Sequence, residues 1–204
     1  MFYSLDGVAC TTKSTILSRL DRDYRYNVHL IDYKEISDQL GLRNDPTLDG
    51  IIYLMYRDNY KVPKNFCRHV FDREPTSALL YRFVQFNSDD ATVRKYCTLV
   101  KKMGVNKHWT SIILLPRQGQ EDIVVELMKK RNNGIDWLNV EYVKRQCRIF
   151  TIWADVMDYD VVYIDYNKNL HEQQTNIINK IHEMCCHENV YTKAIRLLCS
   201  LNKH

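Results

Sequence analysis

The sequence predicts a three-layer α/β fold in which a parallel sheet of about five strands is covered by helices on both faces. Short runs of apolar residues recur along the chain, and segments with helical spacing separate them. Only 6 Gly and 4 Pro are present, so long disordered linkers are not expected. Continuously apolar strands that alternate with helices are typical of a parallel sheet buried on both faces.

Each predicted strand is an apolar run that stops at a polar or turn-forming residue. The run 2–5 stops at Asp6, the run 27–31 at Asp32, and the run 66–71 at Asp72. The run 109–115 is the clearest strand, because four aliphatic residues precede Pro116. The last predicted strand is 161–165. The order of these runs along the chain leaves room for a helix between each pair.

The predicted helices carry apolar residues three and four positions apart, which places them on one face. In the first helix these residues are Ile16, Leu17 and Leu20. Helices are predicted at 13–20, 51–60, 77–86, 122–130, 140–156, 170–185 and 190–201. The sequence shows no repeat, and 204 residues suit a single domain spanning 1–204.

Composition excludes several classes of protein. The formal charge of +4 is too small to indicate direct nucleic-acid binding, although it fits a site for polyphosphate anions. No apolar run reaches the roughly 18 residues of a membrane span, and the N-terminus lacks the features of a secretory signal. Seven unpaired-looking cysteines favour reduced thiols. We therefore expect an intracellular protein, cytoplasmic or nuclear, without a membrane partner.

The segment between the first strand and the first helix has the position of a phosphate-binding loop. Backbone N–H groups at a helix N-terminus bind phosphates there. Lys13 is expected to reach the terminal phosphates, Ser14 to bind Mg²⁺ through its hydroxyl, and Gly7 to allow a tight exit from the strand. The residues expected to contact the nucleotide are Gly7, Thr11, Thr12, Lys13, Ser14 and Thr15.

This loop departs from the consensus at one position. The consensus has glycine immediately before the lysine, whereas this sequence has Thr12. A β-branched side chain at that point clashes with a phosphate or opposes a positive φ. The loop therefore matches the phosphate-binding consensus only in part, and its position between the first strand and the first helix supports the functional interpretation.

Four segments together resemble a known family. Leu5-Asp6-Gly7 followed by Lys13-Ser14-Thr15 is similar to the opening of thymidine, deoxynucleoside and thymidylate kinases. The segment 70–80 resembles the Asp-Arg motif of herpesvirus-type thymidine kinases, 127–136 resembles their basic lid, and 163–165 their last strand. Each motif is weak alone, but their order spans nearly the whole chain. The resemblance implies a P-loop kinase fold with a lid around 127–139, ATP and Mg²⁺, and a homodimer.

The Asp-Arg motif and the lid would supply positive charge to the transferred group. Arg73, at the carboxyl end of a strand, is expected to point into the crevice and grip a phosphate or the 5′ end of a substrate. Asp72 either orients Arg73 or approaches the metal; the alternative is a surface ion pair. Arg131 would close over the phosphates, although a solvated basic helix end explains it equally well.

The resemblance also implies residues on the acceptor side. The family places a catalytic base just after the second strand, which is Asp32 here, with Glu35 as the second choice. Either residue is also explained as a helix-start carboxylate. Arg57 resembles the substrate arginine of thymidylate kinases, or it is an exposed helical arginine.

Three functions remain open from the sequence. The first is a deoxynucleoside or thymidine kinase, possibly of viral origin, that transfers the γ-phosphoryl of ATP to a nucleoside 5′-hydroxyl. The second is a thymidylate kinase, which acts on a nucleoside monophosphate. The third is an inactive kinase fold used for nucleotide binding or protein interaction. The third is indicated by Thr12, Cys10, and the lid, where Asn132 and Asn133 replace further arginines.

Overall fold

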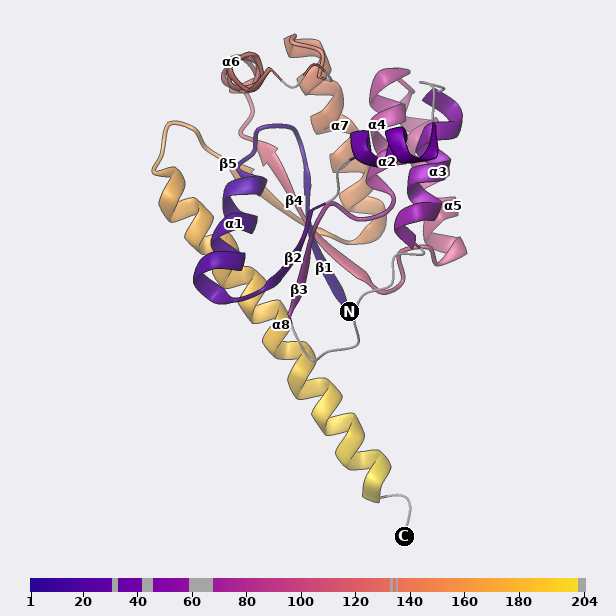
Figure 1. Cartoon of the computed structure of the whole chain (residues 1–204), viewed down its shortest axis with the longest axis vertical. Coiled ribbons are helices and arrows are strands. Elements are labelled where there is room, and N and C mark those ends of the chain that lie inside the picture. Colours follow the sequence, from indigo (N-terminus) through magenta and orange to yellow (C-terminus); the bar gives the residue numbers. More distant parts are fainter. Residues whose placement is uncertain (31–32, 42–45, 59–67, 133, 135, 202–204) are drawn as a thin grey trace.

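A parallel sheet lies at the centre of the protein, with helices on both of its faces (Figure 1). The computed structural model describes residues 1–30, 33–41, 46–58, 68–132, 134 and 136–201. The predicted three-layer α/β fold is confirmed. The described elements follow in the order β1 (Phe2–Gly7), α1 (Lys13–Tyr24), β2 (Asn27–His29), α2 (Tyr33–Leu40), α3 (Pro46–Asp58), β3 (His69–Asp72), α4 (Ser77–Gln85), α5 (Asp90–Met103), β4 (Trp109–Pro116), α6 (Glu121–Arg131), α7 (Val140–Met157), β5 (Asp160–Ile164) and α8 (Leu170–Leu201).

The strands pair in the order β2-β3-β1-β4-β5, and every neighbouring pair is parallel. In β1, Leu5 lies opposite Asp72 of β3, and Gly7 lies opposite Leu114 of β4. The chain leaves β1 toward β2 on one side, whereas it leaves β4 toward β5 on the other. β1 therefore ends where the winding reverses, which is the place where open α/β sheets bind ligands.

The centre of the sheet is buried on both faces, and β4 shows this most clearly because Ile112 to Leu115 are all apolar. In β4, Ile112 and Leu114 pack with α1 and α8, while Ile113 and Leu115 pack with α4 to α7. Alternating side chains point to opposite faces of a strand, so a sheet covered on both sides needs apolar residues throughout. Figure 1 shows α8 crossing the α1 face and then continuing beyond the rest of the protein.

Several of the predicted element boundaries are wrong. The sequence analysis placed two helices at 170–185 and 190–201, whereas α8 is continuous from Leu170 to Leu201. No Gly or Pro lies between the two segments, so the polar residues there continue the helix. β2 ends at His29, and Asp32 and residues 66–67 lie outside the described residues.

Helices α2 and α5 were not predicted. In α5 a single narrow stripe, Val93, Cys97 and Val100, is buried against the rest of the protein. The residues at both ends of α5 match helix-capping patterns, although the apolar pattern does not reveal the helix. Asp89 accepts a hydrogen bond from the Thr92 amide at the N-terminus, and Gly104 ends the helix in a left-handed conformation.

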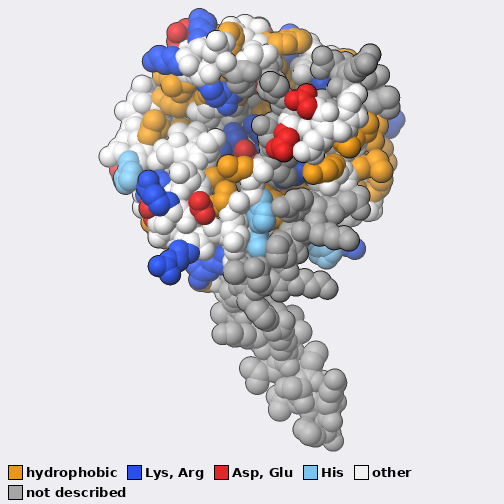
Figure 2. Space-filling view, in the orientation of Figure 1, with side chains coloured by type: hydrophobic (Ala, Val, Ile, Leu, Met, Phe, Trp, Pro, Cys, Tyr) orange, Lys and Arg blue, Asp and Glu red, His pale blue; other side chains and the backbone are white. Residues whose placement is uncertain are grey.

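Three features of the described residues concern membrane spans, thiols and surface charge. None of the described helices is long and apolar enough to cross a bilayer. Cys10, Cys97, Cys147, Cys185 and Cys186 are free thiols. On the face shown in Figure 2, the Lys and Arg side chains of the described residues stand in separate groups.

Candidate functional site

Gly7 ends β1 and cannot be replaced by a residue with a side chain. Its φ is 110°, and a Cβ built on it would lie 2.2 Å from the Leu114 carbonyl oxygen. Glycine is therefore required by the close approach of β1 to β4 as well as by the turn. This allows the following loop to leave the sheet directly over its carboxyl edge.

The loop after Gly7 contains two residues with a left-handed backbone. Cys10 has a φ of 58° and Thr12 a φ of 62°, and α1 begins at Lys13. Left-handed residues in such loops help to turn backbone N–H groups toward one concavity, which binds anions. The conformation costs roughly 1–2 kcal/mol at each residue other than glycine. The conflict that the sequence predicted at Thr12 is therefore present in the backbone.

Lys13 is folded back against its own loop. Its ammonium group donates to the Val8 carbonyl at 2.5 Å, to the Gly7 carbonyl at 3.4 Å and to the Thr11 hydroxyl at 3.1 Å. Burial, and then the charge of Arg73, lower its pKa from 10.5 to about 7. A phosphate at this place would favour the charged form of Lys13 and raise its pKa again.

The first turn of α1 is open to ligands. Ser14 and Thr15 are exposed, and the first turn contains no acidic side chain. Because the N-terminus of a helix carries a partial positive charge, this turn favours an anion. Among the described residues, no group of three or more His, Cys, Asp or Glu could hold a metal. A magnesium ion would therefore depend on the Ser14 hydroxyl, phosphates and water, a set that Mg²⁺ accepts.

Asp6 is a buried carboxylate that joins β1 to the turn after β3. It accepts hydrogen bonds from the Gly7 amide at 2.8 Å, the Glu74 amide at 3.3 Å and the Ser77 hydroxyl. It also forms an ion pair with Arg73 at 3.0 Å. A fully buried carboxylate needs partners of this kind, since an unpaired one would be strongly destabilising.

Arg73 lies directly after β3 in a left-handed conformation, with a φ of 71°. Its guanidinium contacts Asp6, donates to the Gly7 carbonyl at 3.2 Å and lies 4.7 Å from the centre of the Tyr81 ring. The Tyr81 hydroxyl donates to the same carbonyl at 3.2 Å. Arg73 is therefore held against Gly7, where the phosphate loop begins.

Arg57 and Asp72 lie beside this turn. Arg57 of α3 is buried and donates to the Asp72 carbonyl at 3.4 Å and to the Arg73 carbonyl. The interpretation of Arg57 as an exposed helical arginine is therefore wrong. The Asp72 carboxylate raises the pKa of Lys13, which places it close to the phosphate loop.

The segment predicted as a lid, 127–139, starts within α6. Arg131 forms an ion pair with Asp136, and its charge acts on both Lys13 and Cys10. Besides burial, the charges of both Arg73 and Arg131 lower the pKa of Lys13. Of the two acceptor-side carboxylates, Asp32 lies outside the described residues, and Glu35 is exposed on α2, where Gln39 donates to it at 3.1 Å.

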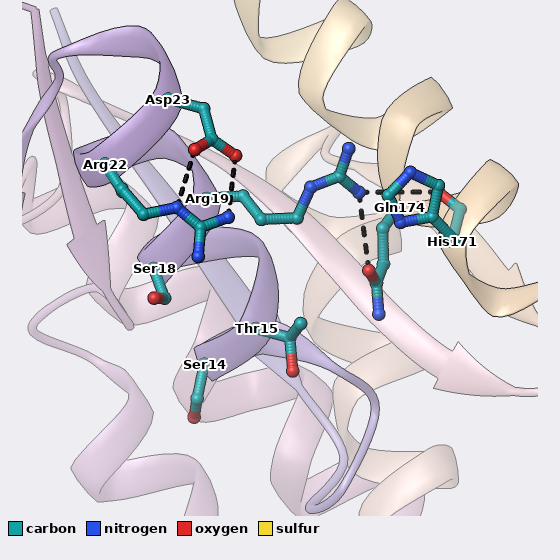
Figure 3. A pocket seen from close by; sticks show the side chains of 8 residues that line it. All are labelled: Ser14, Thr15, Ser18, Arg19, Arg22, Asp23, His171 and Gln174. Atoms are coloured by element: carbon teal, nitrogen blue, oxygen red, sulfur yellow. Dashed lines mark hydrogen bonds and ion pairs between the residues drawn. The ribbon is translucent and has the colours of Figure 1, made fainter.

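A second concavity lies beside α1, on the side that faces α8 (Figure 3). Its volume is about 730 Å³, and Ser14 and Thr15 of the first turn of α1 are among the residues that line it. Arg19 crosses it and donates to the His171 carbonyl and the Gln174 side chain, both at 3.4 Å. The cavity therefore adjoins the phosphate loop, and Arg19 ties α1 to α8. Its remaining lining residues are Ser18, Arg22 and Asp23.

Several residues at the site carried no signal in the sequence. Gln146 of α7 accepts a hydrogen bond from the Ala9 amide at 3.0 Å, and the Tyr166 hydroxyl donates to the Cys10 carbonyl at 3.0 Å. Glu74 is fully buried, and burial followed by the Asp6 charge raises its pKa to about 8. Asp6 stands next to the glycine of the loop motif, which was the one indication available beforehand.

The chain resembles a kinase of known structure. The chain superposes on deoxyadenosine kinase from M. mycoides with a TM-score of 0.61 and 17% identity in the form with dCMP and dCDP, and 0.61 and 18% in the form with dATP. The first alignment covers 90% of this chain and the second 89%, and both cover 100% of the kinase. The fold is that of a P-loop kinase. At this identity, the likeness concerns the fold and leaves the substrate open.

At the sequence level, the chain is similar to a viral protein. It is 35% identical over 185 residues to an uncharacterized 33.9 kDa protein from Lymantria dispar multicapsid nuclear polyhedrosis virus. The alignment covers 89% of this chain and 63% of that relative, so the chain spans less than two thirds of the relative's length. No family model matches the sequence.

Proposed function

We propose that the protein is a nucleoside kinase that transfers the γ-phosphoryl of ATP to the 5′-hydroxyl of a deoxynucleoside. The observation that carries the proposal is that Lys13 and Arg73 both donate to the Gly7 carbonyl at the start of the phosphate loop, where the charge of Arg131 also acts on Lys13. A phosphate bound among these cations would gain favourable charge interactions. Phosphoryl transfer depends mainly on such positioned charge, and the shared fold with deoxyadenosine kinase supports the nucleoside as acceptor.

Each part of the loop has a role in this proposal. The left-handed backbone at Cys10 and Thr12 helps to direct N–H groups at the phosphates, and Lys13 would exchange its contacts with Val8 and Thr11 for phosphate oxygens. ATP with Mg²⁺ supplies the phosphoryl group, and Ser14 would hold the metal. Arg131 would leave Asp136 and close over the phosphates, which stabilises the charge that develops during transfer.

The acceptor side is part of the same proposal. Asp32 follows β2 by three residues and would accept the proton of the 5′-hydroxyl, with Glu35 as the alternative base. Arg73 would contact the group that receives the phosphoryl. Arg57 would act through the turn, because its guanidinium already bonds the carbonyls of Asp72 and Arg73.

The test is an assay of phosphorylation with ATP and Mg²⁺ across deoxynucleosides and nucleoside monophosphates. We expect phosphorylated deoxynucleosides, and a loss of at least about 100-fold for Lys13→Ala, because a charge at the transferred group is removed. Lys144→Ala is the matched control, since Lys144 is exposed on α7 and pairs with Glu141. Phosphorylation of monophosphates alone would instead identify a thymidylate-kinase type of activity, and full activity of Lys13→Ala would refute the site.

A second candidate is a nucleotide-binding protein without transfer activity. Thr12 favours this candidate. Its backbone is left-handed, and its buried hydroxyl has no hydrogen-bond partner among the described residues. Calorimetry with ATP and Mg²⁺ separates the two candidates. Binding without any product across the whole panel would support the binding protein, whereas product formation excludes it.

A further inference from the structure

The phosphate loop holds a conformation that its own residues disfavour. Cys10 and Thr12 both have left-handed backbones, although neither is glycine. Within the loop, the Thr11 hydroxyl donates to the Val8 carbonyl at 2.7 Å, and Lys13 contacts the same carbonyl. If a phosphate draws Lys13 away, one of these internal contacts is lost. The loop therefore needs support from outside to keep its shape when a nucleotide binds.

Two contacts from distant elements provide such support, and they lie on either side of Cys10. On one side, the Ala9 amide donates to the Gln146 side chain at 3.0 Å. On the other side, the Cys10 carbonyl accepts from the Tyr166 hydroxyl at 3.0 Å. The two held groups bracket the φ and ψ angles of Ala9 and Cys10, so fixing both groups limits the combinations of angles that these residues can adopt and favours the left-handed form at Cys10.

Both partners are themselves held firmly. Gln146 is fully buried in α7, a helix of 18 residues whose first turn is capped by Asn139. Tyr166 follows β5, and its amide donates at 2.9 Å to the side chain of buried Gln120. Burial raises the pKa of the Tyr166 hydroxyl, so it remains a donor at neutral pH. The two contacts thus join the loop to rigid parts of the α4–α7 side and the β5 end.

We propose that Gln146 and Tyr166 are positioning residues that keep the phosphate loop in the shape that glycine at positions 10 and 12 would adopt without help. Their role in nucleotide binding rests on the proposed function, whereas their effect on the loop does not. They act through the backbone of Ala9 and Cys10 and do not contact the reacting atoms themselves. The protein thereby replaces local backbone freedom with tertiary hydrogen bonds.

The experiment measures hydrogen–deuterium exchange in the free protein over a peptide spanning residues 6–16, corrected for intrinsic rates. Removal of one hydrogen bond by Gln146→Leu or Tyr166→Phe is expected to accelerate exchange in this peptide about fivefold, and more in the double variant. The matched controls are Gln174→Leu, in α8, and Tyr26→Phe, whose hydroxyl bonds His182 at 2.6 Å. The side chains of these two residues bond Arg19 and His182 and not residues 6–16, so exchange in the peptide should stay at the wild-type rate.

A rescue variant separates positioning from general loss of stability. Adding Thr12→Gly to Gln146→Leu should slow exchange again by about threefold, because glycine relieves the left-handed strain. Unchanged exchange in both single variants, equal acceleration in the controls, or no rescue by Thr12→Gly would each overturn the proposal. If Gln146→Leu does not fold, Tyr166→Phe, which removes one oxygen atom, carries the test with its own Thr12→Gly rescue.

The same variants separate this proposal from the proposed function. Exchange is measured without nucleotide, so a wild-type protein that binds no ATP would refute the kinase assignment and leave the exchange result standing. Where ATP binds, Tyr166→Phe should raise its dissociation constant about fivefold, and Thr12→Gly should restore it. An ATP affinity that stays at the wild-type value in accelerated variants would overturn the link between loop shape and binding.

Discussion

The loop after β1 and the turn after β3 solve the same backbone problem in different ways. Both hold left-handed residues that are not glycine, at Cys10 and Thr12 in the loop and at Arg73 in the turn. The loop is held by neutral hydrogen bonds from Gln146 and Tyr166 to its backbone. The turn is held by the charge of buried Asp6, which binds the strained residue through its own side chain.

The two kinds of contact differ in how easily a bound ligand can displace them. A neutral hydrogen bond contributes about 1 kcal/mol, so the loop can shift when a ligand competes for its groups. A buried ion pair is costly to break, because removal of one partner leaves an uncompensated charge. We therefore expect the turn to act as a fixed support at the β1–β3 edge, and the phosphate loop to be the adjustable part of the site.

The largest effect is expected when the fixed support is broken. Asp6→Asn should lower the free energy of unfolding by about 4 kcal/mol, because Arg73 loses its buried partner. Urea unfolding measures the change. Asp155→Asn is the matched control, since its pair with Arg94 is exposed on both sides and should contribute less than about 1 kcal/mol. Equal losses in the two variants would contradict the contrast between turn and loop.

The next effect depends on pH and concerns Glu74, which follows Arg73 in the same turn. Its pKa is raised to about 8, so the folded state holds a proton that the unfolded state releases above pH 4.5. The associated stability is present at low pH and is lost as pH rises, by about 1 kcal/mol per unit between pH 5 and 8. Glu74→Gln should remove this slope.

Unfolding of wild type and Glu74→Gln at several pH values measures that slope. Tyr159 and Asn106 contact the Glu74 carboxyl at 3.0 and 3.4 Å, so the variant also alters two hydrogen bonds. That contribution is independent of pH in this range, which is why the difference in slope is the deciding quantity. If the free energy of unfolding changed with pH in the same way in both proteins, Glu74 would be ionised in the folded state.

A smaller effect sharpens the description of the loop. Thr12→Gly should raise the free energy of unfolding by about 1 kcal/mol, because glycine adopts the φ of 62° without strain. Thr151→Gly is the matched control in the interior of α7, where glycine should lower stability by a few tenths of a kcal/mol. Thermal unfolding of both variants provides the comparison. A loss of stability in Thr12→Gly would mean that the loop gains more from the threonine side chain than it loses in the backbone.

The smallest effect is a proton balance at Lys13. With its pKa near 7, the amine is mostly neutral at pH 8 and should take up about one proton when phosphates bind. Calorimetry of ATP binding in two buffers with different ionisation enthalpies measures this uptake. Lys13→Met should abolish it, whereas an unchanged uptake would assign the proton to another group.

The sequence led to the fold and to the position of the phosphate loop because both depend on local patterns. The apolar runs that stop at Asp6 and Asp72 lie at the ends of β1 and β3, whereas β2 ends at His29, and the parallel sheet follows from burial on both faces. α5 was missed because its buried stripe is narrow and most of its surface is polar. The motif order also predicted that Lys13, Arg73 and Arg131 share one site; Lys13 and Arg73 both donate to the Gly7 carbonyl, while the shared site itself stays a prediction.

By itself, the sequence determined the three-layer fold, the loop between β1 and α1, and the strained threonine at its end, since apolar periodicity and the residue before Lys13 are local properties. Only the tertiary structure decided what holds that loop. Gln146 and Tyr166 lie 137 and 156 positions away from the residues they bond, and Asp6 lies 67 positions from Arg73. Hydrogen bonds and ion pairs of this separation leave no periodic pattern in the sequence, because they depend on which elements the packed sheet brings side by side.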